Sequence, residues 1–253
     1  MKALIVYFSG TGNTAYVARK IEQVMKEFGV EAVSQSIEEL DELNTVNFDF
    51  LVLGCPKYYE YPVLDFIQSI EKKLVPSQRT ISTMIYGTQA AYLQTDFSKL
   101  EKILRTRNYK VTVTKSFQIA NNMVIFGAFP GTDSEKIKKN LKKLTEDLKP
   151  LVGDFLAGRE NKEHPSFLYR KGTHLSGVVF TKLFPIFAMK YSASEACVSC
   201  GICAAKCPKG NITMQKGKPQ FGKNCIFCMR CINICPQNAI QYNKKTCTQY
   251  KKL

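Results

Sequence analysis

The stretch ALIVYFSGTGNT, Ala3 to Thr14, joins a run of apolar residues to a turn made of glycines, hydroxyl side chains and an asparagine. The apolar run from Ala3 to Phe8 is continuous rather than alternating, which indicates a strand buried on both faces. A helical pattern follows the turn, because apolar side chains recur on one face from Val17 to Phe28. A strand, a turn and a helix in this order predict the first unit of a parallel sheet covered by helices.

The same alternation continues through the first 158 residues. Further strands are predicted at residues 48–54, 80–87 and 110–120, each apolar or rich in β-branched side chains. A last helix is predicted from about Thr132, because Thr132 and Glu135 have the spacing of a capping box, and Pro150 is expected to kink or end it. The fold class predicted for residues 1–158 is therefore α/β, a doubly wound parallel sheet.

The turn after the first strand has the chemistry of an anion site. Its glycines let the backbone approach an anion, its N–H groups can point at the anion, and the helix dipole favours negative charge there. No lysine follows the glycines, so the turn is not a P-loop, and it does not read G-x-G-x-x-G. Hydroxyls and amides without a cation favour a phosphate monoester on a flavin over a nucleoside triphosphate. A structural turn that binds nothing is the alternative.

This turn resembles the phosphate loop of the flavodoxins, which reads [ST]-x-T-G-x-T and is matched here by Ser9, Thr11, Gly12 and Thr14. The resemblance implies the flavodoxin-like strand order 2-1-3-4-5 and non-covalent FMN at the switch point of the sheet. The residues expected to bind the phosphate group are the whole loop: Ser9, Gly10, Thr11, Gly12, Asn13 and Thr14.

In flavodoxins two further loops enclose the flavin ring, and the resemblance places them here at residues 55–62 and 88–92. Tyr58 or Tyr59 is expected to stack on the ring, with Tyr92 and the strand-end glycine Gly87 as further cofactor-binding residues. The alternative is that these tyrosines only cap the sheet, since aromatic rings at strand ends are common core residues. Glu60 and Tyr61 stand where many flavodoxins have a glycine and a small residue, so the surroundings of the ring are expected to differ.

Eight of the ten cysteines lie in two copies of the pattern C-x2-C-x2-C-x3-C-P, at residues 197–208 and 225–236. Each cysteine recurs 28 residues later, as Cys197 does at Cys225, so the segment is interpreted as a duplicated unit with a pseudo-twofold axis. Disulfides and tetrahedral zinc are the two alternatives. Disulfides need no such fixed spacing, and zinc ribbons use two separated C-x2-C knuckles.

The repeat resembles the bacterial two-cluster ferredoxins, small α+β domains in which the fourth cysteine of each run ligates the other cluster. Carried over, the resemblance implies one [4Fe-4S] cluster on Cys197, Cys200, Cys203 and Cys235. It implies a second cluster on Cys225, Cys228, Cys231 and Cys207. Apolar residues between the ligands are expected to keep water from the clusters: Val198, Ile202, Ile226, Ile232 and Ile234.

The whole chain resembles the flavodoxin-ferredoxin fusion proteins of anaerobic prokaryotes. The expected division is a flavodoxin-like domain at 1–158, a connector at 159–193, a ferredoxin domain at 194–243 and a basic tail at 244–253. The function expected is electron transfer between the two clusters and FMN, since a cluster passes one electron and FMN holds one or two. A flavin-dependent reductase of a small substrate, and a redox or iron sensor with an empty flavodoxin domain, are the alternatives.

The charge is uneven, because residues 194–253 carry ten basic side chains and one acidic residue, Glu195, in a chain of formal charge +15. This predicts an acidic protein as redox partner, steered by electrostatics. Nucleic-acid binding is not expected, since aromatic interleaving is sparse and no known motif is present. The apolar segment 175–191 contains Lys182, Pro185 and Lys190, so we expect it to dock on one of the domains. A spanning helix is not expected there, and membrane-surface contact is the weaker interpretation. A cytoplasmic location is expected, since the N-terminus lacks the pattern of a signal peptide.

Overall fold

The computed structural model describes residues 1–91, 94–123, 125 and 133–250. The chain divides into two compact units. The first comprises Met1–Ala120 and Asp133–Gly177, and the second is centred on the residues from Val178 onward. In the part of the chain that the structure describes, no helix combines the length and the apolar character needed to cross a membrane.

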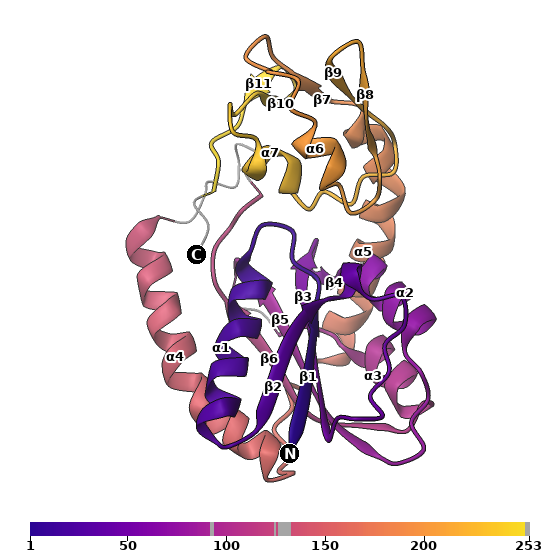
Figure 1. The fold of residues 1–253 in the computed structure, drawn as a ribbon, viewed down its shortest axis with the longest axis vertical. Coiled ribbons are helices and arrows are strands. Elements are labelled where there is room, and N and C mark those ends of the chain that lie inside the picture. The colour runs from indigo at the N-terminus through magenta and orange to yellow at the C-terminus, as the bar shows by residue number, and fades with distance from the viewer. Residues whose placement is uncertain (92–93, 124, 126–132, 251–253) are drawn as a thin grey trace. The chain divides into compact units, whose positions relative to one another are not determined.

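A parallel sheet forms the centre of the first unit (Figure 1). Its strands are β1 (Lys2–Tyr7), β2 (Glu31–Ser36), β3 (Phe50–Tyr58), β5 (Ile81–Gln89) and β6 (Tyr109–Gln118), in the order β2-β1-β3-β5-β6. A two-residue strand, β4 (Tyr61–Pro62), pairs with the end of β3. With β4 set aside, this is the predicted order 2-1-3-4-5, and the prediction of a doubly wound parallel sheet is confirmed.

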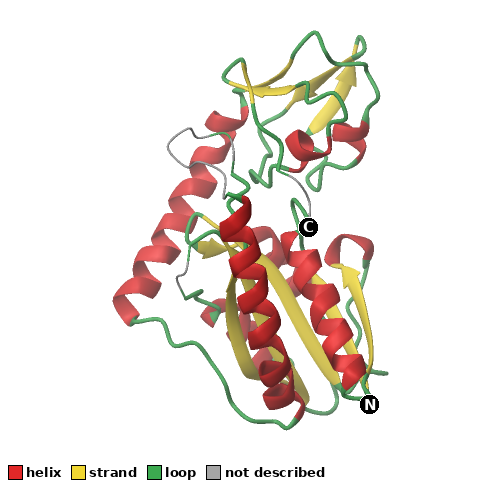
Figure 2. Ribbon diagram, turned by 90° about the vertical axis from the view of Figure 1, so that its left-hand side faces the viewer, coloured by secondary structure: helices red, strands yellow, loops and turns green. Residues whose placement is uncertain are grey.

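Helices cover both faces of this sheet, as Figure 2 shows from the side. Helix α1 (Asn13–Glu27) packs against α4 (Ser134–Leu156), and α2 (Leu64–Lys73) packs against α3 (Ser98–Arg105). A short 3-10 helix, Ile37–Glu39, follows β2. The apolar runs of the strands are buried as expected, with Ile5, Leu53 and Ile85 fully shielded from solvent.

Helix α4, the last helix predicted for this unit, begins one residue later than the capping box predicts. Thr132 lies outside the described residues, and Asp133 is the N-cap, with its carboxylate accepting a hydrogen bond from the Lys136 N–H at 2.8 Å. The helix does not end at Pro150 but runs through it to Leu156, with Leu151 and Phe155 buried beyond the proline. Packing of this apolar stripe outweighs the lost backbone hydrogen bond.

Helix α5 (Phe167–Ala188) contributes residues to both units. Its residues up to Gly177 belong to the first unit, where the Ser176 hydroxyl donates to the Tyr59 carbonyl. Its later residues belong to the second unit, where Phe184 packs on Phe227 with 5.0 Å between ring centroids. The expectation that this apolar segment docks on one of the domains is wrong in one respect, because its contacts divide between the two units.

The second unit is made of short elements. Strands β7 (Tyr191–Ala193), β10 (Ile240–Tyr242) and β11 (Lys245–Thr246) form one antiparallel sheet, and β8 (Ile212–Gln215) pairs with β9 (Lys218–Phe221). Two helical turns, α6 (Ile202–Ala205) and α7 (Arg230–Ile234), lie within the two cysteine runs and contain Cys203 and Cys231. Because β11 pairs with β10, the segment expected to be a basic tail begins as part of this sheet.

Candidate functional site

The turn from Ser9 to Thr14 connects β1 to the N-terminus of α1, at the carboxyl edge of the sheet. The Ser9 hydroxyl oxygen accepts hydrogen bonds from the N–H groups of Gly12 at 3.2 Å and Ala15 at 3.3 Å. Gly12 has φ of 110°, a left-handed conformation that glycine adopts without strain. The hydrogen bonds to the Ser9 hydroxyl therefore shape the turn that connects β1 to the start of α1.

Neighbouring strands hold this turn in place. The Thr14 and Thr88 hydroxyls lie 2.8 Å apart, the Asn13 amide donates to the Ala120 carbonyl at 3.5 Å, and the Tyr86 hydroxyl donates to the Thr14 carbonyl at 3.0 Å. A Cβ atom on Gly54 would lie 2.1 Å from the Tyr86 ring, so that glycine makes room for the tyrosine. The result is a turn fixed by contacts from β5 and from the end of β6.

The loop suits a phosphate group. The first turn of α1 contains no acidic residue, so the positive end of the helix dipole is not neutralised by the protein itself. Thr11, Asn13 and Thr14 are buried polar side chains gathered at that helix end. The donor set is hydroxyl, amide and backbone N–H, which matches a phosphate monoester held without a lysine.

The first ring loop, expected at residues 55–62, forms a hairpin. Strand β3 continues to Tyr58 and turns back through Tyr59 and Glu60 into β4, pairing Tyr58 with Tyr61. Tyr59 and Glu60 have φ of 52° and 67°. A two-residue turn with both residues left-handed is usual for hairpins, but Asn and Gly normally occupy it. Two bulky residues here are strained by about 1 to 3 kcal/mol each, so surrounding contacts must hold the turn.

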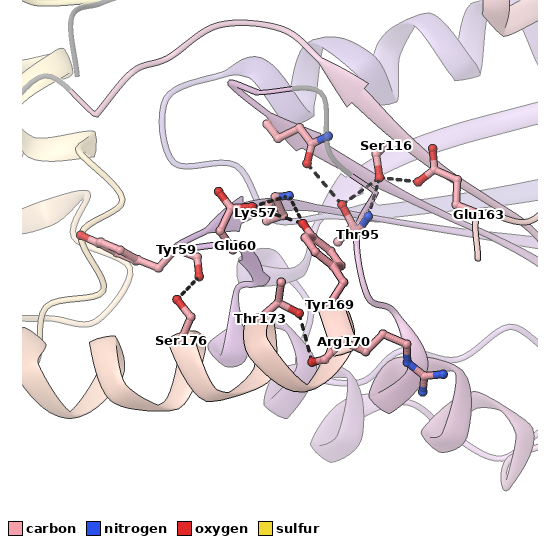
Figure 3. A network of polar contacts seen from close by, with 11 residues as sticks. Lys57, Tyr59, Glu60, Thr95, Ser116, Glu163, Tyr169, Arg170, Thr173 and Ser176 are labelled. Atoms are coloured by element: carbon pink, nitrogen blue, oxygen red, sulfur yellow. Dashed lines mark hydrogen bonds and ion pairs between the residues drawn. The ribbon is translucent and has the colours of Figure 1, made fainter. Parts of the chain in front are cut away.

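Those contacts come from the neighbouring lysine and from α5 (Figure 3). The Lys57 side chain is 3% exposed, and its Nζ lies 2.9 Å from Glu60 Oε2 and 3.3 Å from the Tyr169 hydroxyl. The Tyr169 hydroxyl also donates to Glu60 Oε2 at 3.3 Å. Burial, followed by the Glu60 charge, raises the pKa of Tyr169 to about 12, so it remains a hydrogen-bond donor at neutral pH. In Figure 3 the Tyr59 ring points away from this cluster.

The second ring loop follows β5. Gly87 lies inside β5 rather than after it, and a Cβ atom there would come within 3.1 Å of both Thr95 and Phe97. Gly87 therefore lets the segment 94–97 pack onto the strand. Gln89 ends β5 with its side chain buried. Tyr92 lies outside the described residues.

Sequence reasoning missed the residues of α5 and of the segment before it. Tyr169 and Ser176 contact the first ring loop, and Arg170 contacts Asp96 in the segment after the second. Their spacing carries no motif, and they lie in the segment predicted to be a connector. The close approach of α5 has one sequence signal, Gly177, because a Cβ atom there would lie 2.9 Å from the Tyr61 Cβ.

In the second unit the two cysteine runs have the same backbone. Left-handed residues recur at the period of 28, with Ser199 and Gly201 in the first loop matched by Phe227 and Met229 in the second. The helical turns α6 and α7 begin at matching positions, as do strands β8 and β10. The duplication seen in the sequence is thus a duplication of structure.

Backbone N–H groups point at the sulfurs in a repeated way. The fourth cysteine of each run accepts from the residue four positions later, Asn211 on Cys207 at 3.3 Å and Ala239 on Cys235 at 3.2 Å. The Phe227 N–H lies 3.4 Å from the Cys225 sulfur. Such N–H donors favour thiolates and tune the potential of an iron-sulfur cluster.

The sulfurs that raise each other's pKa fall into two groups. Burial raises the pKa of Cys225 to about 12, and the Cys228 and Cys207 sulfurs act in the same direction. Burial also raises the pKa of Cys203, with Cys235 and Cys197 adding to it. Each set thus combines cysteines of one run with the fourth cysteine of the other run, which is the pairing that the ferredoxin resemblance implies. Buried thiols of this kind ionise when iron binds them.

All ten cysteines are among the described residues and form no disulfide. Within those same residues, no group of three or more His, Cys, Asp or Glu side chains is placed to hold one metal ion.

The two cysteine loops differ in exposure. In the second loop Ile226 and Ile232 are buried at 9% and 0% exposure, as expected of side chains that exclude water. In the first loop Val198 is 59% exposed and Ile202 is 39% exposed, and Cys200 is exposed as well. The expectation of an apolar shield is therefore wrong for the first loop, whose side chains face solvent.

Comparison with known families identifies both halves. Residues 4–146 match the family model described as a flavodoxin domain, and residues 196–240 match a 4Fe-4S dicluster domain. A curated flavodoxin of Megasphaera elsdenii is 40% identical over 52 residues, which is 21% of this chain and 38% of the relative. The matched stretch thus spans well under half the length of that relative.

Solved structures give similar matches. A flavodoxin from the domain Archaea is 16% identical, with 62% of this chain and 99% of that chain covered and a TM-score of 0.45. The two-electron reduced flavodoxin of Megasphaera elsdenii is 23% identical, with 45% and 84% covered and a TM-score of 0.41.

Proposed function

Because the chain belongs to the flavodoxin domain family and also carries a 4Fe-4S dicluster domain, we propose that it moves electrons between its iron-sulfur clusters and FMN, and exchanges them with a protein partner. Both domains are of electron-transfer types, one associated with flavin and the other with iron-sulfur clusters. The observation that carries the finer proposal is that cysteines of one run neighbour the fourth cysteine of the other run, Cys225 and Cys228 with Cys207, and Cys197 and Cys203 with Cys235, on the same chain as a turn suited to phosphate. The cofactors are FMN and 4Fe-4S clusters.

In the first unit we assign phosphate binding to Ser9–Thr14. Ser9 shapes the turn, Gly12 supplies the left-handed bend, and the helix start supplies N–H donors. Tyr58 and Tyr59, in the hairpin after β3, and Gln89, at the end of β5, are the assigned ring neighbours. These strands end at the carboxyl edge, next to the switch point between β1 and β3, where ligands of such sheets bind.

In the second unit we assign the eight cysteines as ligands, in the sets Cys197, Cys200, Cys203 with Cys235, and Cys225, Cys228, Cys231 with Cys207. When bound, a cluster carries one electron and FMN one or two, so the pair matches one-electron to two-electron carriers. The protein contributes N–H donors to sulfur and an aromatic core around the second loop, where Phe227 is buried against Tyr191. The N–H donors stabilise negative charge on sulfur and the aromatic core limits access of water, and both effects tune the potential.

We place the partner at the first cysteine loop. This loop exposes Val198, Ile202 and Cys200, and the lysines of the second unit have few acidic neighbours. Exposed lysines of this unit include Lys206, Lys216, Lys223, Lys244 and Lys245. Exposed apolar residues in a unit rich in exposed lysines suit an acidic protein and electrostatic steering.

The reductase alternative would need a substrate pocket beside the ring. A polar cleft of about 600 Å³ lies along the flank of the first unit, lined by residues that include Asp96, Arg105, Tyr109 and Glu160. One end of this cleft is lined by Tyr109, at the amino edge of β6, and the other by Thr95, Asp96 and Arg170, after β5. Its position therefore does not separate the two functions.

A reductive titration of the full chain, loaded with both cofactors under anaerobic conditions, tests electron exchange. Substoichiometric reductant should distribute electrons between clusters and flavin according to their potentials, followed by visible absorption and electron paramagnetic resonance. The proposal would be contradicted if the clusters became reduced and the flavin stayed oxidised at every ratio of reductant to protein. This outcome counts only if the potential of the flavin lies within the range of the titration. Charge reversal at Lys216 and Lys223 should slow reduction by an acidic partner, whereas reversal at the exposed Lys139 of α4 should not.

A further inference from the structure

The hairpin turn at Tyr59 and Glu60 is strained, and the contacts that hold it come from far along the chain. The Ser176 hydroxyl donates to the Tyr59 carbonyl at 2.9 Å, which fixes the orientation of the peptide in the strained turn (Figure 3). The Tyr169 hydroxyl and the buried Lys57 hold the Glu60 carboxylate. Two bulky residues with left-handed backbone conformations are strained, and such a turn persists only where surrounding contacts stabilise it. These contacts therefore determine the shape of the turn.

The same stretch of chain holds the segment after β5. Arg170 Nε lies 3.3 Å from Asp96 Oδ1, and the Asp96 side chain is 6% exposed. The Ser116 hydroxyl lies 2.5 Å from Glu163 Oε2 and 2.8 Å from Thr95 Oγ1, and Thr95 donates to Gln89 Oε1 at 3.5 Å. A hydrogen-bonded line thus runs from Glu163 to the last residue of β5, as Figure 3 shows in part.

These contacts bear on the two loops assigned to the flavin ring, and they come from residues outside the matched flavodoxin domain. The match ends at residue 146, whereas the contact residues are Glu163, Tyr169, Arg170 and Ser176. A helix that only packed on the unit would need apolar contacts. This one instead directs polar side chains to a strained carbonyl, a carboxylate and a buried aspartate.

We propose that Glu163, Tyr169, Arg170 and Ser176 form a collar that positions both ring loops for FMN, so that the flavin site is incomplete without residues 163–177. The collar rests on the proposed function, because it presupposes that FMN binds at the carboxyl edge of this sheet. Its members are positioning residues that act through the loops. Tyr169 and Ser176 set the turn after β3, and Glu163 and Arg170 set the segment after β5.

The test uses full-length protein with its clusters intact and two single-group deletions, Tyr169→Phe and Ser176→Ala. Each should weaken FMN binding roughly twofold to tenfold, the range for loss of one hydrogen bond, as measured by flavin fluorescence. Each should also change the visible circular dichroism of the bound flavin. Matched controls are Tyr109→Phe, whose hydroxyl bonds Thr45 and Val75 at the opposite edge, and Thr106→Ala, whose hydroxyl bonds the Ile103 carbonyl.

The expected pattern is a loss of affinity and an altered flavin spectrum in the collar variants alone, with Ser176→Thr restoring both. If collar and control variants lower the unfolding temperature equally and neither affects FMN, the collar is only structural and the inference is overturned. A parent protein that binds no FMN would instead refute the proposed function, so the two failures are distinguishable.

Discussion

The candidate cluster ligands come from one stretch, Cys197 to Cys235, whereas the residues around the candidate flavin site extend from Ser9 to Ser176. The second unit has strands of two to four residues, and Phe227 and Ile232 lie buried beside the cysteine loops. The first unit has a sheet with its own core, in which Leu51, Leu53 and Ile85 are fully buried. We therefore expect the clusters to be part of what folds the second unit, and FMN to bind a unit that folds without it.

The largest effect that tests this contrast is removal of iron. Chelation under anaerobic conditions should unfold the second unit, because buried thiols and short elements lose the metal that joins them. Hydrogen exchange measured by peptide should show loss of protection across residues 197–242 and retained protection in the strands of the first unit. Simultaneous loss in both units would break the contrast, and removal of FMN alone should leave both patterns nearly unchanged.

A packing change in the first unit should come next. Gly54→Ala places a methyl group where the Tyr86 ring lies, and overpacking of this kind should destabilise the sheet by about 3 kcal/mol. The control is Gly153→Ala in α4, where a Cβ atom would meet Phe28 at an ordinary 3.6 Å. Urea unfolding should give a lower free energy of unfolding for Gly54→Ala than for Gly153→Ala. Cluster absorbance should be unaffected in both variants. Equal stabilities would mean that Tyr86 can move aside.

Alkaline pH should destabilise the first unit through Cys55. Burial raises the pKa of this thiol from about 9 to about 12, so above pH 9 the unfolded chain releases a proton that the folded chain keeps. Stability conferred by this group is present below pH 9 and falls as pH rises, by about 1.4 kcal/mol at pH 10. Comparing unfolding free energies of parent and Cys55→Ala from pH 8 to pH 10 isolates this slope. Parallel curves would show that the folded thiol ionises normally.

The smallest effect concerns the phosphate loop. Gly12→Ala forces alanine into φ of 110° with no atom within 4 Å of the new Cβ, so strain alone should act, at about 1 kcal/mol. FMN affinity should fall roughly fivefold by fluorescence titration. Gly29→Ala imposes a similar strain at φ of 75° outside the loop and should leave FMN affinity unchanged. Equal FMN affinities in both variants would show that Gly12 is not part of the phosphate site.

The contrast also explains what could be predicted from the sequence. Cysteine ligands and the Ser9–Thr14 turn are set by residues adjacent in sequence, so their spacing carries the information. The parallel sheet followed from the alternation of apolar runs with helical patterns, and its strand order was implied by the resemblance to flavodoxins. The hairpin at Tyr59 and Glu60 could not be foreseen, because neither residue type suits its backbone conformation and the contacts from Tyr169 and Ser176 lie over a hundred positions away.

The same limit applies to burial around the first cysteine loop. Val198 and Ile202 are apolar and occupy the positions of shielding residues, yet they face solvent while Ile226 is covered. The difference depends on which element packs over each loop. Phe184 and Phe187 of α5 cover Phe227 of the second loop, a contact that local sequence does not encode.

The most direct test of the central claim is a cofactor count on anaerobically purified full-length protein, with flavin identified after denaturation and compared with iron and acid-labile sulfide. The account predicts about one FMN with about eight iron and eight sulfide per chain. About eight iron with no FMN, even after FMN is supplied, would contradict it and leave the first unit as a domain that does not carry electrons.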